Sequence, residues 1–451
     1  MSISRQHILF ITVAILTFLE MGCLTAWRKD SDPHTLPFIY LSIQLAVGVL
    51  PLLFFRKKEV PPQYIREKIE KNVSDLESKP FGKFQTFQKV FKSSSTVNID
   101  KKAQIVLAIL GIWGGYKCYL VLTNQYSRIA LNPAYSDIIP QIQQFCKQAA
   151  NWKYPYTPFD DFGYRMSPTY LPAQWMPYMP AHWFKFDPRF VTLTIFLCTY
   201  AYSAWLAIKK SSHVVFAFLL LAIPVYHVIL VDEHDQGVWS VTVEMLIMCF
   251  YWLLGIGIIE KKYTLVAIAT ILCLMSRFAL VFWLPLFLFI LWLQNGQMFT
   301  KRFVFSIIGG CLLLYGPFLA VDYKIFYNAQ IYYDAATVGE WTRDGKPVHL
   351  YNGLGFALYF LERGGDVVYN IALIKKIMLG ISALLSIGLG ILWWRVKDKI
   401  DSDLYAICAL KLSLALFYAF IQIPYSYLYV TPFIISCVIL LKLSRQPAIH
   451  I

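Results

Sequence analysis

The sequence is dominated by apolar runs of about 20 residues that are separated by shorter polar or basic segments. A run of this length is what a helix needs to cross the hydrocarbon core of a membrane. Of the 451 residues, 57% are hydrophobic and only 15% are charged, which differs from the composition of a soluble protein. We therefore predict an all-α polytopic membrane protein.

The positive charges are unevenly distributed along the chain. Residues 56–102 hold twelve Lys and Arg against six Asp and Glu, whereas residues 321–368 hold four against six. Cytoplasmic loops of membrane proteins carry such an excess of Lys and Arg, and they face an anionic leaflet. We therefore interpret the net charge of +14 as a topology signal and predict no nucleic-acid partner. The predicted location is the cell (inner) membrane, with both termini in the cytoplasm.

The apolar runs predict about twelve transmembrane helices and two large extracytoplasmic loops. The predicted spans are 7–24, 36–55, 103–122, 190–208, 214–231, 238–259, two half-length helices within 263–293, then 303–320, 369–394, 404–423 and 427–441. Two half-length helices are predicted because 263–293 is too long for one straight span and Ser276 and Arg277 interrupt it.

These spans divide the chain into three parts. The first part is an N-terminal transmembrane hairpin (1–55), and the second is a basic cytoplasmic loop (56–102). The remainder is a transmembrane core (103–451) with outer loops at 123–189 and 321–368. Most of the nine cysteines lie inside apolar runs, and no CxxC or HExxH motif occurs, so we predict neither a disulfide framework nor a metal site.

The first outer loop has the composition of a folded element. Between residues 126 and 187, aromatic residues, prolines and carboxylates alternate, whereas a flexible tether would be rich in Gly and Ser. Apolar residues recur at helical spacing at Ile139, Ile142, Phe145 and Ala149. This spacing predicts a short helix over 138–150, with Ser136 or Asp137 at its N-cap.

Three polar features converge on the outer side in this topology: Asp137, the acidic turn over 232–235, and Arg277 between the half-length helices. A carboxylate at the membrane surface can act as a general base for a hydroxyl nucleophile. An arginine at membrane depth is costly unless it binds an anion or snorkels to the interface. The combination suits a reaction between a phosphate leaving group and an acceptor hydroxyl.

These residues carry a resemblance to a known family. Ser136-Asp137, the outer helix and the Tyr- and Pro-rich run over 164–172 resemble the first outer loop of GT-C glycosyltransferases, in particular the polyprenyl-phosphate-mannose-dependent mannosyltransferases. Asp235-Gln236-Gly237 is similar to the Gln/Gly motif of this group in reversed order, and the run 427–432 is similar to the pattern in the last span. The resemblance covers about residues 103–441.

The resemblance implies a GT-C-like core that moves mannose, or another hexose or pentose, from a polyprenyl-phosphate donor to an acceptor hydroxyl on the extracytoplasmic face, with inversion. The acceptor would be a glycan, lipid or protein. Asp137 would deprotonate the acceptor, and Arg277 would contact the donor phosphate. The expected substrate-binding residues are Asp160, Asp161, Tyr170, Asp235, Gln236 and Tyr427. The pattern requires no cofactor and permits a divalent cation.

Each of these residues has a simpler interpretation. Asp137 could serve only as an N-cap, worth about 1 kcal/mol to its helix, and Arg277 only as a snorkelling charge. Asp160 and Asp161 could stabilise turns of their own loop. His234 could bind a metal with the acidic residues around it, or be simply solvated.

Two other functions fit part of the sequence. A transporter or flippase of lipid-linked sugars would also have about twelve spans, and the ionisable residues within the predicted spans favour it; they are Glu20, Glu244 and Lys411. A membrane-bound acyltransferase would need a catalytic histidine, for which His213 and His227 are available without a companion motif.

Overall fold

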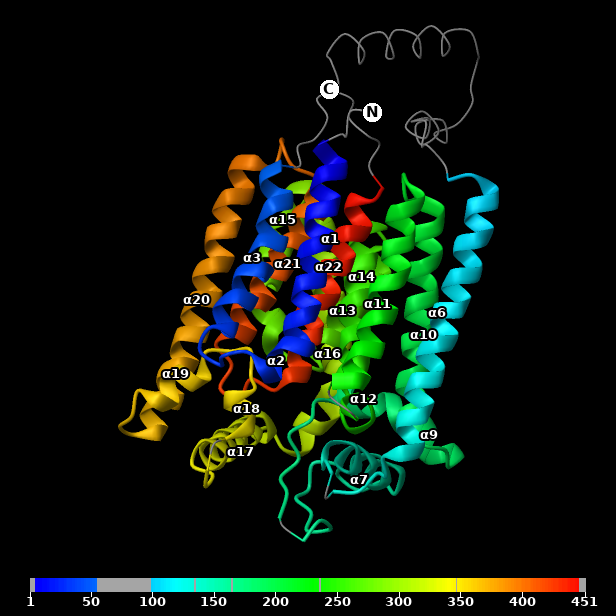
Figure 1. The fold of residues 1–451 in the computed structure, drawn as a ribbon. Coiled ribbons are helices and arrows are strands. Elements are labelled where there is room, and N and C mark those ends of the chain that lie inside the picture. The colour runs from blue at the N-terminus through cyan, green and yellow to red at the C-terminus, as the bar shows by residue number, and fades with distance from the viewer. Residues whose placement is uncertain are drawn as a thin grey trace, which may run out of the picture.

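The protein is described by a computed structural model that covers residues 5–54, 99–133, 135–163, 165–234, 237–345 and 347–445. Within these ranges the secondary structure consists of helices, and the only β pairing is an isolated bridge between Phe159 and Met166. The prediction of an all-helical chain is confirmed (Figure 1). Most of the predicted basic loop, residues 56–98 of 56–102, lies outside the described residues.

In the part of the chain that the structure describes, nine helical segments are long and apolar enough to cross a membrane. They are α1 (Arg5–Leu24), α3 (Leu36–Phe54), α6 (Lys101–Arg128), α10 (Arg189–Lys210), α11 (Val214–His234), α16 (Gln297–Val321), α20 (Val367–Val396), α21 (Ser402–Ala419), and η3 (Ser426–Tyr429) with α22 (Val430–Leu443). Three shorter apolar helices occupy the remaining predicted spans: α13 (Glu244–Ile259), α14 (Tyr263–Leu274) and α15 (Leu284–Asn295). The chain is thus a polytopic α-helical membrane protein.

Two breaks in the helices face each other across the interior. The predicted interruption at Ser276 and Arg277 is present, because α14 ends at Leu274 and the short 3-10 helix η2 (Phe278–Phe282) precedes α15. The run 238–259, predicted as one continuous helix, is divided into α12 (Val238–Val241) and α13. Thr242 causes the division, since its hydroxyl donates to Val238 O (2.8 Å) and accepts from Glu244 N (3.4 Å).

The helices form one bundle with two distinct ends. α1, α6 and α20 span its length, and the starts of α1 and α6 lie at the same end as the finish of α22 (Figure 1). The hydrophobic core is centred on α13, which is buried along nearly its whole length and packs against α10, α14, α21 and α22. The hairpin of α1 and α3 packs against α21 and α22, so residues 5–54 are joined to residues 402–443.

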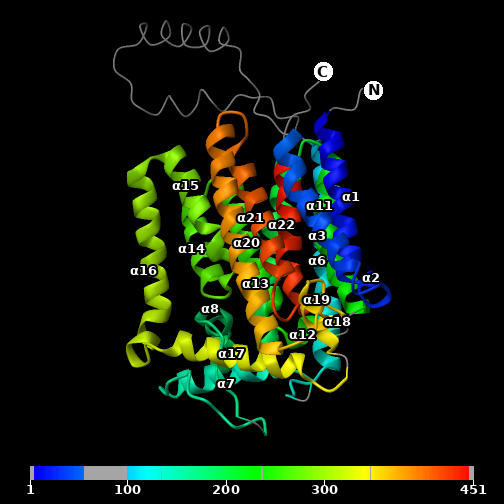
Figure 2. The same ribbon diagram turned by 90° about the vertical axis from the view of Figure 1, so that its left-hand side faces the viewer.

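The opposite end carries the two outer loops, which are largely helical. Their elements are α7 (Ile138–Ala150), α8 (Pro172–Trp175), η1 (Met176–Tyr178), α9 (Met179–Phe184), α17 (Ile325–Trp341), α18 (Val348–Tyr351) and α19 (Ala357–Glu362). The helix predicted over 138–150 is confirmed as α7, whereas α17 was not predicted. α17 lies across this end of the bundle (Figure 2), and Tyr332 on it donates to Arg165 O of the first loop (2.8 Å). A short turn, α2 (Ala26–Asp30), follows α1 at the same end.

A buried arginine closes the first outer loop at its base. The Arg189 side chain is 6% exposed and pairs with Asp187 at 2.6 Å. Its guanidinium also donates to Tyr126 O (2.9 Å) and Ile129 O (2.7 Å), where the loop leaves α6. Five charge-assisted bonds at one side chain, three to Asp187 and two to these carbonyls, therefore hold the beginning and the end of the loop together.

A fully buried ion pair joins the N-terminal hairpin to the C-terminal helices. Lys411 Nζ lies 2.6 Å from Glu20 Oε1, and both side chains are 0% exposed. Ser436 donates to the other carboxylate oxygen of Glu20 (2.7 Å), and Lys411 also donates to Pro432 O (2.9 Å). Both charges are thus satisfied by α1, α21 and α22 together, as buried charges must be.

We expect Lys411→Met to lower the free energy of unfolding by about 3–5 kcal/mol, because it leaves Glu20 buried and unpaired. The double change Glu20→Met with Lys411→Met should recover most of that loss. Thermal unfolding of the purified protein in detergent measures both effects. Lys375→Met is the matched control, since its pair with Asp334 is exposed by 29% and 46% and should contribute less than about 1 kcal/mol. Equal losses in the single and double variants would contradict the expectation.

Candidate functional site

The two helix breaks bring an arginine and a glutamate together. Arg277 occupies the N-cap position of η2, and Glu244 is the first residue of α13. Their side chains form an ion pair and hydrogen bond from Arg277 Nη2 to Glu244 Oε1. Glu244 is 1% exposed, whereas the Arg277 side chain keeps 28% exposure. The pair therefore has a buried acidic side and an accessible basic side.

The pair leaves hydrogen-bonding capacity unused. Among the described residues, neither Arg277 Nε nor Glu244 Oε2 has a hydrogen-bond partner. A buried polar atom without a partner costs roughly 1–3 kcal/mol, so a bound group that supplied the missing partner would stabilise the pair. A planar guanidinium presents its donors in a fork that matches the oxygens of a phosphate. The accessible side of Arg277 is thus suited to an anionic ligand.

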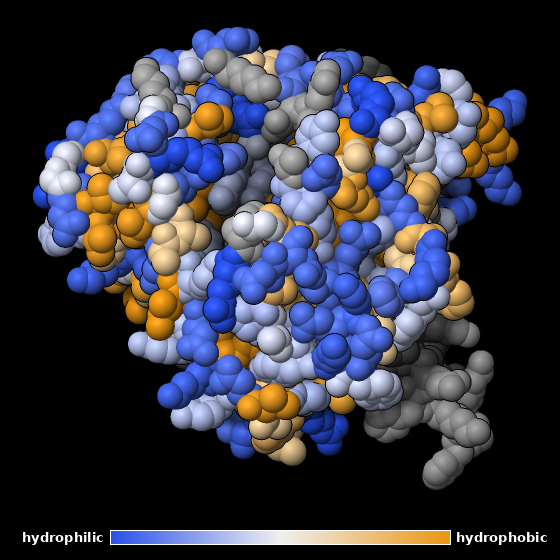
Figure 3. Space-filling view, turned by 90° about the horizontal axis from the view of Figure 1, so that it is seen from below, coloured by the Kyte–Doolittle hydropathy of each residue, from blue (hydrophilic) through white to orange (hydrophobic). Residues whose placement is uncertain are grey.

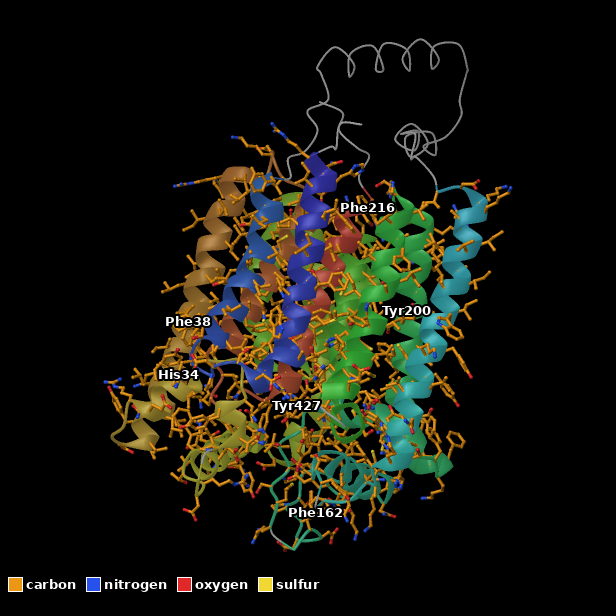
Figure 4. The ribbon with its side chains drawn as sticks, viewed as in Figure 1. His34, Phe38, Phe162, Tyr200, Phe216 and Tyr427 are labelled. Carbon is orange, nitrogen blue, oxygen red and sulfur yellow. The ribbon has the colours of Figure 1, made fainter. Side chains whose placement is uncertain are left out.

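Tyrosines from four separate segments surround Arg277. Its charge acts on Tyr170 of the first outer loop, Tyr333 of α17, Tyr418 of α21 and Tyr427 of η3. The rings of Tyr425 and Tyr427 stack with their centroids 5.1 Å apart. Figure 4 shows Tyr427 at the base of the bundle, where the outer loops begin. We call Arg277, Glu244 and these five tyrosines the Arg277 cluster.

Asp137 lies close enough to this cluster for its charge to act on two of the tyrosines. Burial raises the pKa of Tyr170 well above its usual value, the nearby charge of Asp137 raises it further, and Arg277 opposes both. Burial likewise raises the pKa of Tyr425, and Asp137 is again among the charges that contribute. A carboxylate and a guanidinium therefore act on the same phenol, that of Tyr170.

The side chain of Asp137 does not cap its helix. Asp137 occupies the N-cap position of α7 and its main-chain oxygen accepts from Gln141 N (2.8 Å), yet its carboxylate makes no capping hydrogen bond. The neighbouring Ser136 instead donates to Val241 O of α12 (3.0 Å) and accepts from Ile138 N. Ser136 thus fixes the start of α7 beside the break that precedes Glu244.

The first outer loop is also bonded directly to the second break. Ala173 N donates to Met275 O (3.0 Å), two residues before Arg277. Gln174 Oε1 accepts from Leu171 N (2.9 Å), which fixes the turn that follows Tyr170. These bonds explain why Tyr170 lies beside Arg277.

The predicted residues Asp160 and Asp161 lie elsewhere, in the exposed tip of the loop. Phe162, their neighbour, lies below Tyr427, at the lower edge of the molecule in Figure 4. Asp161 accepts from Gln144 Nε2 of α7 (2.5 Å), and Asp160 O accepts from Gly163 N (3.3 Å). Figure 3 shows this end of the molecule, where hydrophilic side chains cover most of the surface and apolar ones form smaller patches.

The acidic turn predicted over 232–235 is helical as far as His234, because α11 continues to that residue, and Asp232 in its last turn stabilises helix packing. Asp232 accepts from Gln125 (2.5 Å) and pairs with Arg128 (3.2 Å), both on α6. Gly237 then takes φ +94°, a backbone conformation that favours glycine because a residue with a Cβ is strained there. The other two predicted residues of this turn, Asp235 and Gln236, lie outside the described residues.

Sequence reasoning did not assign Glu244, Tyr333, Tyr418 or Tyr425 to the site. Glu244 carried a usable signal, because an ionisable residue in an apolar run needs a partner and Arg277 is the matching charge in the neighbouring run. The tyrosines carried no signal that would assign them to the site, since tyrosine is common throughout this chain. Among the described residues, no group of three His, Cys, Asp or Glu side chains could hold a metal ion.

Comparison with protein-family models, with curated proteins and with solved structures finds no match to this chain.

We expect Arg277→Gln to destabilise the protein more than Glu244→Gln does. Loss of the arginine leaves a carboxylate that is 1% exposed without its counter-charge, which costs about 3–5 kcal/mol. Loss of the glutamate leaves an arginine that still reaches water, so the cost should be about 1–3 kcal/mol. The free energy of unfolding in detergent measures the difference. A larger loss in Glu244→Gln would contradict the assignment of the buried and accessible sides.

Proposed function

We propose that this protein is a glycosyltransferase of the GT-C type that transfers a sugar from a polyprenyl-phosphate donor to an acceptor hydroxyl on the extracytoplasmic face. The proposed core has twelve crossings, with the Arg277 cluster at its outer end. The supporting observation is the placement of Asp137 and Arg277, an anionic and a cationic group, around the same tyrosine, Tyr170.

In the proposed reaction, Arg277 and Asp137 have separate roles. Arg277 holds the phosphate of the donor, and its pairing with Glu244 fixes the direction in which the guanidinium points. Asp137 removes the proton from the acceptor hydroxyl as the hydroxyl attacks the anomeric carbon. The bond from the sugar to the phosphate breaks, the phosphate leaves on the polyprenyl chain, and a single displacement inverts the anomeric centre.

The tyrosines are suited to hold the sugar. Aromatic rings present flat apolar faces with a polar edge, and a phenol can both donate and accept hydrogen bonds. Tyr170 and Tyr427 keep the substrate-binding role that the sequence predicts, and Tyr333 and Tyr425 join them. The exposed Asp160 and Asp161 would then bind the acceptor, which must be large enough to extend from the Arg277 cluster to the tip of the loop.

Asp137→Asn should lower the rate of sugar transfer by about 10²–10⁴-fold, because an amide cannot act as a general base. The assay measures transfer or hydrolysis from a short-chain polyprenyl-phosphate mannose, and from a panel of other lipid-phosphate sugars, by the purified protein.

Asp366→Asn is the matched control for this experiment. Asp366 is also an N-cap residue in an outer segment, but its carboxylate accepts from Val368 N (2.9 Å), a role that asparagine fills about as well. Full activity of Asp137→Asn would exclude Asp137 as the base. A wild-type protein that neither processes nor binds any of these donors would overturn the proposal, and transport in liposomes would then test the flippase alternative.

A further inference from the structure

A groove on the outside of the bundle, toward the end opposite the Arg277 cluster, has the features of a lipid site. It lies between α15 and α20, which pack against each other and are adjacent in Figures 1 and 2. Its volume is about 480 Å³. The residues that line it are Phe289, Ile387, Gly390, Ile391, Trp394 and Arg395.

The walls of the groove are apolar and open to the surroundings of the bundle. Ile387, Ile391 and Trp394 are 61%, 54% and 55% exposed. The Trp394 ring stacks on Phe289 of α15, with centroids 6.1 Å apart and planes 18° apart. In a membrane protein these exposed apolar faces are covered by hydrocarbon, so an acyl chain is the natural occupant.

Gly390 makes the groove possible. A Cβ at Gly390 would meet only Leu286 Cδ1, at 3.8 Å, so the space above it is open rather than filled by a neighbour. Ile387 and Arg395 are eight residues apart on α20, which is about 12 Å along a helix. The groove therefore extends from the level of a charged side chain about 12 Å into the apolar zone.

Positive charge lies at one end of the groove only. Arg395 is exposed and makes no hydrogen bond or ion pair with another described residue. Lys397, two residues later, places its Nζ over the Trp394 ring, 4.6 Å from the ring centroid. Lys399 is also exposed, and Asp398 is the single acidic residue between Arg395 and Lys399. The charge distribution of the sequence assigns this end to the cytoplasm, where the leaflet is anionic.

We propose that this groove binds one anionic phospholipid of the cytoplasmic leaflet, with its phosphate at Arg395 and an acyl chain along Ile391, Gly390 and Ile387. Trp394 lies at the level of the glycerol backbone, the position that interfacial tryptophans prefer. The inference is independent of the proposed transferase activity, because it concerns the opposite end of the bundle.

The test uses native mass spectrometry of the full-length protein in detergent, mixed with equal amounts of palmitoyl-oleoyl phosphatidylglycerol and palmitoyl-oleoyl phosphatidylcholine. The wild type should retain the anionic lipid about fivefold more, as expected for one basic side chain near the surface. Arg395→Gln should abolish most of this preference. Gly390→Leu should reduce retention of both lipids, and it should fold normally because leucine favours helix over glycine.

Arg302→Gln is the matched control, since Arg302 is an exposed arginine on α16 and not part of the groove. It should retain the wild-type preference. The proposal is overturned if Arg395→Gln keeps that preference, if Gly390→Leu keeps wild-type retention, or if the wild type shows none. A dimer that disappears in Gly390→Leu would also overturn it, because a second copy of the chain would then occupy the groove.

Discussion

The ion pair between Arg277 and Glu244 is the constraint to which the outer half of the structure conforms. An unpaired carboxylate in the apolar interior would cost several kcal/mol, so the arginine must lie where Glu244 is buried. Arg277 can reach that place because the helix is interrupted just before it, between α14 and η2. The break at Thr242 likewise puts Glu244 at the start of α13 rather than within a continuous helix.

The same pair explains why the two outer loops converge. Both loops bring tyrosines close enough to Arg277 for its charge to act on their phenols. Tyr170 comes from the first loop and Tyr333 from the second. The loops are therefore part of the fold at this end. Glu20 and Lys411 form a second buried ion pair at the hairpin.

Local pattern was sufficient to predict some of these features and not others. The apolar periodicity over 138–150 predicts α7 with its observed bounds, and the polar pair Ser276 and Arg277 within an apolar run predicts the break. The break at Thr242 was not predictable, because a threonine in an apolar run is also compatible with a continuous helix. The contact of Asp232 with Gln125 and Arg128 depends on the packing of α6 against α11, which no local pattern contains.

The hydrogen bond from Ala173 N to Met275 O has a consequence for how the site could respond to a ligand. It connects the main chain of the first loop to the main chain just before Arg277, with no side chain between them. Energetic coupling between two sites is reciprocal, so a molecule that orders the loop must change the affinity of Arg277 for its anion by the same factor that the anion changes the affinity for that molecule. Any coupling between two substrates bound on either side of this bond would have the same size in both directions, and the order of their binding would not alter the final complex.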